Sequence, residues 1–239
     1  MGIWYAEKMK LDSLIAKIRR KIIRFRLKPI RVYCFHQVSD TFEADTMKEC
    51  DWMRTEDFKR TILALKKHYT FISLTEVKSR LENDFLRTKR FVALTADDGW
   101  ASLKNVLPWL AEQNVPVTLF LNPCYLDGEH FRERDTEKYL TLEELGCFAT
   151  MYKNVSFAMH GWEHKDASAF SDEEFRNDVE RSLRVLSVFP SFVPFYAYPW
   201  GRHNENNDAI LHEYGTTPVL MDGLKNYSDL SFIHRELLV

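Results

Sequence analysis

Short apolar segments alternate with longer amphipathic segments about seven times along this chain of 239 residues. The apolar segments are typical of buried β-strands, and the amphipathic segments have the apolar spacing of helices. Repeated strand–helix units favour a parallel sheet, because consecutive parallel strands need a crossover connection that a helix usually forms. We expect strands at 30–35, 71–72, 90–94, 115–121, 155–159, 192–198, 217–221 and 230–233, and helices at 8–27, 55–67, 75–85, 101–113, 141–151, 171–188 and 208–213.

The number of these units is too large for a small open sheet, and no glycine-rich nucleotide-binding turn follows the first strand. We therefore expect an α/β fold in which residues 30–239 form a single domain, a distorted (β/α) barrel of about seven parallel strands. An open doubly wound sheet is the alternative. The polar segments 39–54 and 122–140 are expected to form loops.

The N-terminal part, residues 1–29, is expected to be a basic amphipathic helix. Residues 1–31 hold 10 Lys or Arg against 2 Asp or Glu, whereas the remaining chain holds 23 against 33. Within residues 8–27 the apolar positions form one stripe of a helix and the basic positions form its remainder. Such a helix can lie on an anionic membrane surface, or it can pack against the barrel with its charges in water.

The overall composition limits the partners and the location of the protein. A net charge of −2 gives no indication of a nucleic-acid partner. No apolar run reaches the roughly 18 residues of a membrane span, and the N-terminus lacks the pattern of a signal peptide. Four scattered cysteines read as free thiols of a reducing compartment. We therefore expect a cytoplasmic protein, with peripheral contact at the inner membrane face through residues 8–27 as a further expectation.

Two adjacent carboxylates, Asp97 and Asp98, follow the apolar strand at 90–94 and precede Gly99. The backbone turns past a strand end, so both side chains can reach one pocket while pointing at different groups. One could hold a metal ion and the other could accept a proton. The simpler alternative is a strand-to-helix turn in which Asp serves as a helix cap.

Two histidines, His160 and His164, stand four residues apart after another expected strand. If this segment turns helically, both imidazoles face the same side. Two histidines and one carboxylate, with Asp98 as the third ligand, suit a borderline divalent ion that keeps open positions for water and substrate. Chance or structural pairing is the alternative explanation of this spacing.

Several of these polar residues share a position just after an expected strand. In an α/β barrel such positions lie on one rim, and that rim carries active sites. The residues concerned are His36, Asp97, Asp98, His160 and Arg235.

Three motifs resemble those of the polysaccharide deacetylases, carbohydrate esterase family 4, also known as the nodulation-type chitooligosaccharide deacetylase homology domain. Residues 94–99 (LTADDG) resemble the family motif T-F-D-D-G, and residues 160–164 (HGWEH) match H-x-x-x-H. Residues 197–201 (AYPWG) resemble F-A-Y-P-Y-G of the subgroup that acts on poly-N-acetylglucosamine exopolysaccharide. Weaker similarities at 33–36, 71–74 and 115–120 keep the family's order, so the resemblance covers roughly residues 30–235.

This resemblance implies metal-dependent removal of an N-acetyl group from an amino sugar. The N-acetylated glycan substrate would be a polysaccharide, an oligosaccharide or a lipid-linked precursor of a surface glycan. Asp98, His160 and His164 would hold the divalent ion, with Zn²⁺ expected first and cobalt, nickel or iron as alternatives. Asp97 would take the proton of the attacking water as general base.

The resemblance also implies roles for residues around that centre. It suggests His36 as the general acid, with His234 as the other candidate, and Arg235 as the cation that keeps Asp97 ionised. A surface position near the C-terminus is the alternative for Arg235. The backbone N–H near Trp200 would stabilise the oxyanion. The residues expected to contact substrate are Tyr198, Pro199, Trp200, Gly201, Trp100, Trp162 and His234.

The chain departs from the family pattern at the wall of the expected substrate pocket. Ala96 replaces the usual Phe, Phe35 stands where the subgroup has Tyr, and the arginine of the family's third motif is missing. Core packing is the alternative role for the tryptophans. Two other functions stay open: hydrolysis of another amide or an acyl ester at the same metal site, and non-catalytic glycan binding. Pure binding is disfavoured by the intact Asp97, Asp98, His160 and His164, because a binder needs no base beside a metal.

Overall fold

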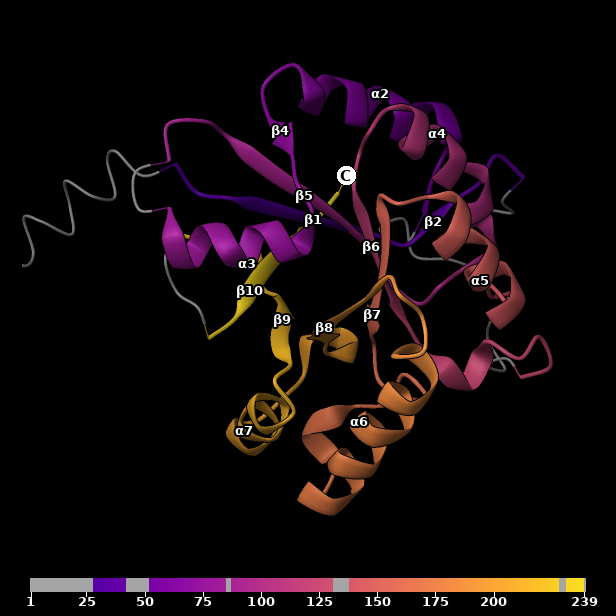
Figure 1. Cartoon of the computed structure of the whole chain (residues 1–239), viewed down its shortest axis with the longest axis vertical. Coiled ribbons are helices and arrows are strands. Elements are labelled where there is room, and N and C mark those ends of the chain that lie inside the picture. Colours follow the sequence, from indigo (N-terminus) through magenta and orange to yellow (C-terminus); the bar gives the residue numbers. More distant parts are fainter. Residues whose placement is uncertain (1–27, 42–51, 85–86, 131–137, 228–230, 239) are drawn as a thin grey trace, which may run out of the picture.

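A ring of seven parallel strands forms the centre of the protein. The computed structural model describes residues 28–41, 52–84, 87–130, 138–227 and 231–238. The ring closes because β1 (Arg31–Phe35) pairs with β5 (Phe91–Ala96) on one side and with β10 (Ile233–Leu237) on the other. Between them run, in spatial order, β9 (Thr217–Met221), β8 (Phe192–Ala197), β7 (Val155–Met159) and β6 (Val117–Leu121) (Figure 1). The expected distorted barrel in one domain is therefore confirmed, and the open sheet is wrong.

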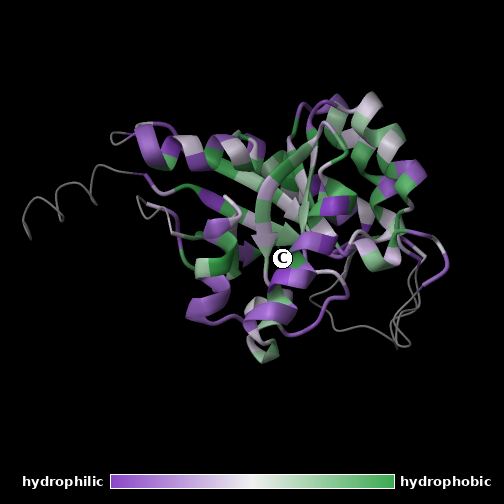
Figure 2. Ribbon diagram, turned by 60° about the horizontal axis from the view of Figure 1, so that its bottom comes forward, coloured by the Kyte–Doolittle hydropathy of each residue, from purple (hydrophilic) through white to green (hydrophobic). Residues whose placement is uncertain are grey.

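Helices cover the outside of this barrel. They are α2 (Thr55–Lys66), α3 (Leu74–Asn83), α4 (Leu107–Glu112), α5 (Leu142–Met151), α6 (Asp172–Leu186) and α7 (Glu205–Glu213), with short 3₁₀ turns η1 (Ala101–Asn105), η2 (Pro123–Tyr125), η3 (Ala167–Ala169) and η4 (Pro199–Gly201). The strands are apolar and the outer helix faces polar (Figure 2). One apolar core lies between helices and barrel, and α3 contributes Leu74, Val77 and Leu81 to a second core with residues of the barrel strands.

Local sequence signals explain several helix ends. Thr141 and Glu144 form a capping box at the start of α5, and Ser171 and Glu174 form another at α6. Ser73 caps α3 by accepting a hydrogen bond from the Glu76 backbone N–H at 3.1 Å.

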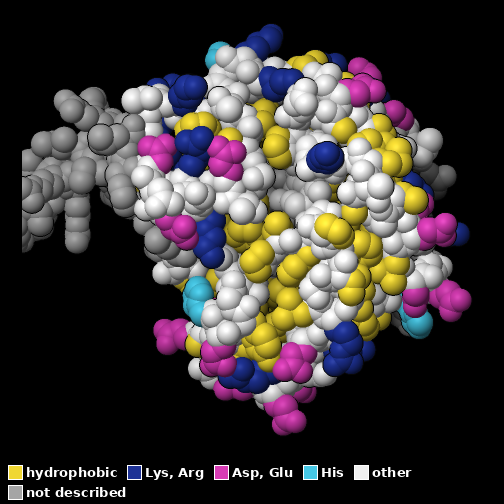
Figure 3. Space-filling model, viewed as in Figure 1, with side chains coloured by type: hydrophobic (Ala, Val, Ile, Leu, Met, Phe, Trp, Pro, Cys, Tyr) yellow, Lys and Arg dark blue, Asp and Glu magenta, His cyan; other side chains and the backbone are white. Residues whose placement is uncertain are grey.

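Charged side chains surround the face seen in Figure 3, and apolar side chains gather toward its middle.

Three expected elements differ in the structure. The expected helix at 101–113 is split into η1 and α4, because Pro108 cannot donate a backbone hydrogen bond and sits in the first turn of a new helix. Inside the expected loop 39–54, Trp52–Met53 forms β3, which pairs with β2 (Gln37–Val38). The expected strand 230–233 is displaced: β10 runs Ile233–Leu237, since the charged residues of this stretch belong to the strand rather than ending it.

The expected N-terminal helix at 8–27, and with it the proposed membrane contact, lies outside the described residues. A two-residue strand, β4 (Thr70–Phe71), extends the sheet beside β5. Among the described residues no helix combines the length and apolarity needed to cross a bilayer.

Candidate active site at the rim of the barrel

The carboxyl ends of adjacent strands bring the acidic pair and the histidines together. Asp97 follows β5, and its backbone N–H donates to the Phe35 carbonyl of β1 at 3.1 Å. His160 follows β7, and its backbone N–H donates to Leu121 of β6 at 2.9 Å. The strand ladder therefore continues past the last strand residues, and it places segments from distant parts of the sequence on one rim.

The turn after Asp97 directs both carboxylates into the site. Asp98 has φ 70° and Gly99 φ 77°, so two consecutive residues adopt the left-handed conformation. A Cβ on Gly99 would come within 2.7 Å of Leu121 Cδ2. Only glycine fits this close approach at positive φ, which explains the glycine directly after the acidic pair.

Asp98, His160 and His164 form a buried group of three metal-ligating side chains. The Asp98 Oδ1 atom lies 3.3 Å from His164 Nε2 and 3.8 Å from His160 Nε2. One ligand atom from each residue lies within 4.8 Å of the others. This donor set of two imidazoles and one carboxylate suits a divalent ion such as zinc and leaves room for further ligands.

The hydrogen bonding of His160 prepares it for a metal. Its Nδ1 donates to the Ala197 carbonyl at 2.8 Å, which leaves the lone pair on Nε2 directed toward the carboxylates. Burial lowers the pKa of His160, although Asp97 and Asp98 oppose this shift. The neutral imidazole that results is the form that binds metal.

The segment from His160 to His164 is not helical, so the expected geometric reason for their pairing is wrong. Gly161 has φ 75° and His164 φ 54°, and the chain bends there instead of winding into a helix. The bend still brings the two rings together, with centroids 4.9 Å apart. Their meeting depends on contacts from neighbouring elements rather than on helical periodicity.

Two buried polar side chains hold this bend. Asn122 donates from its amide nitrogen to the carbonyl oxygens of His160 and Gly161. Asp178 of α6 accepts from the Trp162 backbone N–H at 2.8 Å. Sequence reasoning missed both residues. Asn122 follows β6 directly, so the strand-end rule could have found it, whereas nothing in the α6 sequence distinguishes Asp178 from other polar helix positions.

Asp97 is held by a bidentate ion pair with Arg235. Arg235 Nη1 lies 2.6 Å from Asp97 Oδ1, Nη2 lies 2.9 Å from Oδ2, and Nη1 also donates to Thr95 Oγ1 at 3.1 Å. Arg235 is 1% exposed. Burial would raise the pKa of Asp97, but the positive charge of the adjacent Arg235 guanidinium holds that pKa well below its usual range. The surface alternative for Arg235 is wrong: it lies inside the barrel, within β10.

The two candidate general acids lie in different surroundings. His36 is near Asp97: Cys34 Sγ, one nitrogen of His36 and a carboxylate oxygen of Asp97 lie within 4.8 Å of one another. His234 alternates with the inward-facing Arg235 along β10, and its Nδ1 lies 2.7 Å from Asp222 Oδ2. The structure therefore brings His36, but not His234, to the acidic pair.

The three tryptophans occupy different positions. Trp100 is buried, stacks on Tyr139 and donates from Nε1 to Asp98 Oδ2 at 3.1 Å. The Trp162 ring carries the Arg181 guanidinium at 4.1 Å. Trp200 is 53% exposed, and its ring meets that of His164 edge-on at 4.6 Å between centroids. Of these three tryptophans, Trp200 is the one that offers a broad aromatic surface to a ligand beside the proposed metal ligands.

The remaining residues of segment 197–201 form its frame. Tyr198 is buried and donates to Asp208 Oδ1 at 2.9 Å, and Pro199 is also buried. Trp200 and Gly201 have φ 55° and 70°. These positive φ values turn the chain sharply, and they leave Trp200 exposed above the site.

Several solved structures share this fold, and some of them are named as deacetylases. The chain superposes on IcaB from Ammonifex degensii with a TM-score of 0.75 at 17% identity, covering 89% of this chain and 92% of that one. The deacetylase PplD from Streptococcus pyogenes has a TM-score of 0.74 at 20% identity, over 89% of this chain and 93% of that one. The deacetylase domain of BpsB from Bordetella bronchiseptica has a TM-score of 0.70 at 21% identity, over 87% of this chain and 95% of that one. At these identities the likeness establishes the fold. No curated protein matches the chain.

A sequence model of one family matches more than half of the chain. The polysaccharide deacetylase model aligns with residues 86–219, which include the acidic pair, both histidines of the proposed metal group and segment 197–201. The match agrees with the motif resemblance and with the barrel. The protein is a member of the polysaccharide deacetylase family, a family of carbohydrate deacetylating hydrolases.

Proposed function

We propose that the protein is a metal-dependent hydrolase that removes the N-acetyl group from an amino sugar of a glycan. The observation that carries this proposal is the convergence of Asp98, His160 and His164 beside an Asp97 held ionised by Arg235. The names of similar structures support it: one is a de-N-acetylase from Aggregatibacter actinomycetemcomitans, and PplD was solved with acetate.

Asp98, His160 and His164 would hold the ion, and Zn²⁺ is the cation that this donor set favours, with cobalt, nickel or iron as alternatives. A divalent ion held by these three residues would supply Lewis-acid polarisation of the acyl carbonyl and of the attacking water. His160 keeps its lone pair on Nε2 because Nδ1 is bonded to Ala197. Trp100 fixes the orientation of Asp98 through the bond to Oδ2.

Asp97 would accept the proton of the water as general base. Its Oδ2 lies 3.8 Å from His160 Nε2, so it stands directly beside the metal group. The Arg235 guanidinium favours the ionised carboxylate, which is the form able to accept a proton. The side chains of Asp97 and Arg235 are both buried, so the Asp97 carboxylate is held in one orientation beside the metal group.

His36 would donate a proton to the leaving amine. Among the described residues its buried Nδ1 has no hydrogen-bond partner, and it lies near Asp97 at the same rim. The Trp200 ring would stack on a sugar through its apolar face. The backbone N–H near Trp200 would stabilise charge on the carbonyl oxygen. The glycan would be a polymer, an oligosaccharide or a lipid-linked precursor, and the resemblance of segment 197–201 favours poly-N-acetylglucosamine.

The test is acetate release from N-acetylglucosamine oligomers by the zinc-loaded protein. Asp97→Asn should lower turnover by a factor of roughly a hundred or more while the metal content stays unchanged. Arg176→Gln, which removes an exposed ion pair with Glu213 away from the catalytic rim, is the matched control and should retain full activity. If Asp97→Asn loses its metal instead, the roles assigned to Asp97 and Asp98 are exchanged. If wild-type protein with metal bound releases no acetate from any N-acetylated glycan, the proposed reaction is wrong.

A further inference from the structure

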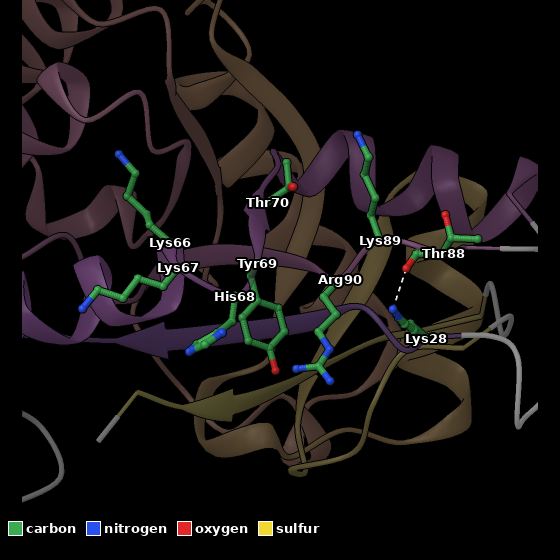
Figure 4. Close-up of a pocket in the computed structure, with 9 residues that line it drawn as sticks. All are labelled: Lys28, Lys66, Lys67, His68, Tyr69, Thr70, Thr88, Lys89 and Arg90. Atoms are coloured by element: carbon green, nitrogen blue, oxygen red, sulfur yellow. Dashed lines mark hydrogen bonds between the residues drawn. The ribbon is translucent and has the colours of Figure 1, made fainter.

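A strongly basic cleft lies away from the proposed active site. Its volume is about 520 Å³, and Lys28, Lys66, Lys67, Lys89 and Arg90 contribute its cations (Figure 4). These side chains come from three separate stretches of the chain: the segment three residues before β1, the C-terminal end of α2 and the residues just before β5. All five residues are exposed, and among the residues that the structure describes no carboxylate lines the cleft.

The cleft lies at the amino ends of the barrel strands. Lys89 and Arg90 directly precede β5, whereas Asp97 and Asp98 directly follow it. Six strand residues at about 3.3 Å each separate the two sites by roughly 20 Å along β5. The basic cleft and the catalytic rim therefore occupy opposite ends of the same barrel.

The positive charges of the cleft are not neutralised by the described part of the chain. Lys28 donates to the Thr88 carbonyl at 2.6 Å, and Lys66 donates to the carbonyl oxygen of Gln113 at 2.8 Å. Both acceptors are uncharged. No ion pair joins any of the five cations to a described acidic residue, whereas other surface cations do pair, such as Arg176 with Glu213.

The α2 helix accounts for only part of this charge. Lys66 and Lys67 stand at its C-terminal end, where cations complement the helix dipole. Lys89 and Arg90 belong to no helix end, and Lys28 comes from a third segment. The remaining body of the chain is acidic, with 23 Lys or Arg against 33 Asp or Glu after residue 31. Lys28, Lys89 and Arg90 therefore carry positive charge that neither a helix end nor a described acidic residue balances.

The sequence extends this charge on the N-terminal side. Residues 1–27 contain 8 Lys or Arg and 2 Asp or Glu, and they continue directly into Lys28 at the cleft. The cleft itself offers flexible, exposed lysines rather than a rigid cradle of buried donors. Such a set of point charges suits many separate phosphates spread over a surface better than one compact phosphate ligand.

We propose that this basic cleft binds the phosphate groups of an anionic lipid surface. Each Lys or Arg near such a surface adds favourable electrostatic energy, and the effect is lost at high salt. Bound in this way, the barrel turns its catalytic rim away from the lipid. This orientation favours the part of a glycan that extends into water over a sugar next to the lipid headgroups.

The test compares full-length variants in vesicle co-sedimentation. The cleft variant carries Lys67→Gln, Lys89→Gln and Arg90→Gln. The control variant carries Lys153→Gln, Arg184→Gln and Lys225→Gln, which changes the net charge equally at exposed sites outside the cleft. Vesicles contain phosphatidylcholine alone or with phosphatidylglycerol, and further arms measure binding to inorganic phosphate and to a DNA oligonucleotide. Melting curves establish that all variants are folded.

Wild type and control should bind the phosphatidylglycerol vesicles equally, and raising NaCl should weaken their binding. The cleft variant should bind roughly a hundredfold more weakly, which corresponds to three lost surface charges. Equal binding by the cleft variant and the control would overturn the proposal. So would wild-type binding to inorganic phosphate or DNA without binding to the anionic vesicles. None of the substituted residues belongs to the catalytic rim, so acetate release by the variants is an independent measurement.

Discussion

The buried side chains of Asp97 and Arg235 should stabilise the protein as an ion pair, and either charge without its partner should destabilise it. Two nitrogen–oxygen contacts of 2.6 and 2.9 Å join side chains that are 5% and 1% exposed. Removing one partner of such a pair leaves an unpaired buried charge and costs about 3–5 kcal/mol. For a chain of this size each kcal/mol lowers Tm by about 2–4 °C. We therefore expect Arg235→Met to lower Tm by about 10 °C.

A double-mutant cycle separates the interaction free energy of the pair from the losses of stability that each single substitution causes. Asp97→Asn should also destabilise, because it leaves the Arg235 guanidinium buried without its partner. The double variant Asp97→Asn/Arg235→Met removes both charges, so it should lose about 3 kcal/mol less than the sum of the single variants. Urea unfolding of protein stripped of metal by a chelator gives the three free energies without a contribution from metal binding.

An exposed ion pair provides the control for this cycle. Arg176 lies 2.6 Å from Glu213, with side-chain exposures of 39% and 56%. Arg176→Met should cost less than about 1 kcal/mol, because water and salt screen an exposed pair. If Arg235→Met costs no more than this control, or if the losses in the cycle simply add, the account of Asp97 as a carboxylate held by Arg235 is wrong.

Two further predictions concern the surroundings of the metal group. Burial raises the pKa of Asp178 from 3.8 to about 6, against the bonds from Trp162 and Tyr196. The native state therefore binds this proton more tightly than the unfolded chain does. The free energy of unfolding should fall by on the order of 3 kcal/mol as pH rises from about 4 to 6. Asp178→Asn should remove that fall in urea titrations across this pH range, and an unchanged pH profile would contradict the raised pKa of Asp178. Trp100→Phe retains a ring that can stack on Tyr139 but loses the hydrogen bond to Asp98. Zinc affinity, measured by chelator competition, should therefore drop by about 10- to 100-fold. An unchanged zinc affinity would show that this hydrogen bond does not position Asp98.

Strand–helix alternation and the strand-end rule were enough to predict the barrel and most of its rim. Asp97, Asp98 and His160 lie where the rule placed them, because parallel strands bring their carboxyl ends to one side. The capping boxes at Thr141 and Ser171 located two helix starts from local sequence. Each of these signals depends only on neighbouring residues or on the direction of the strands.

Other features depend on contacts that no short stretch of sequence specifies. The sequence predicts Arg235 just after a strand, but this residue lies within β10, because a buried arginine interrupts the apolar pattern that indicates a strand. The bend at His160–His164 is held by Asn122 and Asp178. Asn122 precedes His160 by 38 residues, and Asp178 follows Trp162 by 16 residues. Trp100 was expected to contact sugar, yet it is buried and bonded to Asp98. The stacking contact with Tyr139, which is distant in the sequence, holds Trp100 in this buried position.

The metal stoichiometry of wild type and ligand variants tests the central claim most directly. Protein stripped by a chelator, reloaded with Zn²⁺ and freed of excess ion should contain one ion per chain by elemental analysis. Replacing Asp98, His160 or His164 by Ala should lower this occupancy sharply and abolish acetate release, whereas Arg184→Gln should change neither. A wild-type protein that releases acetate without metal, or ligand variants that keep a full ion, would contradict the account of this site.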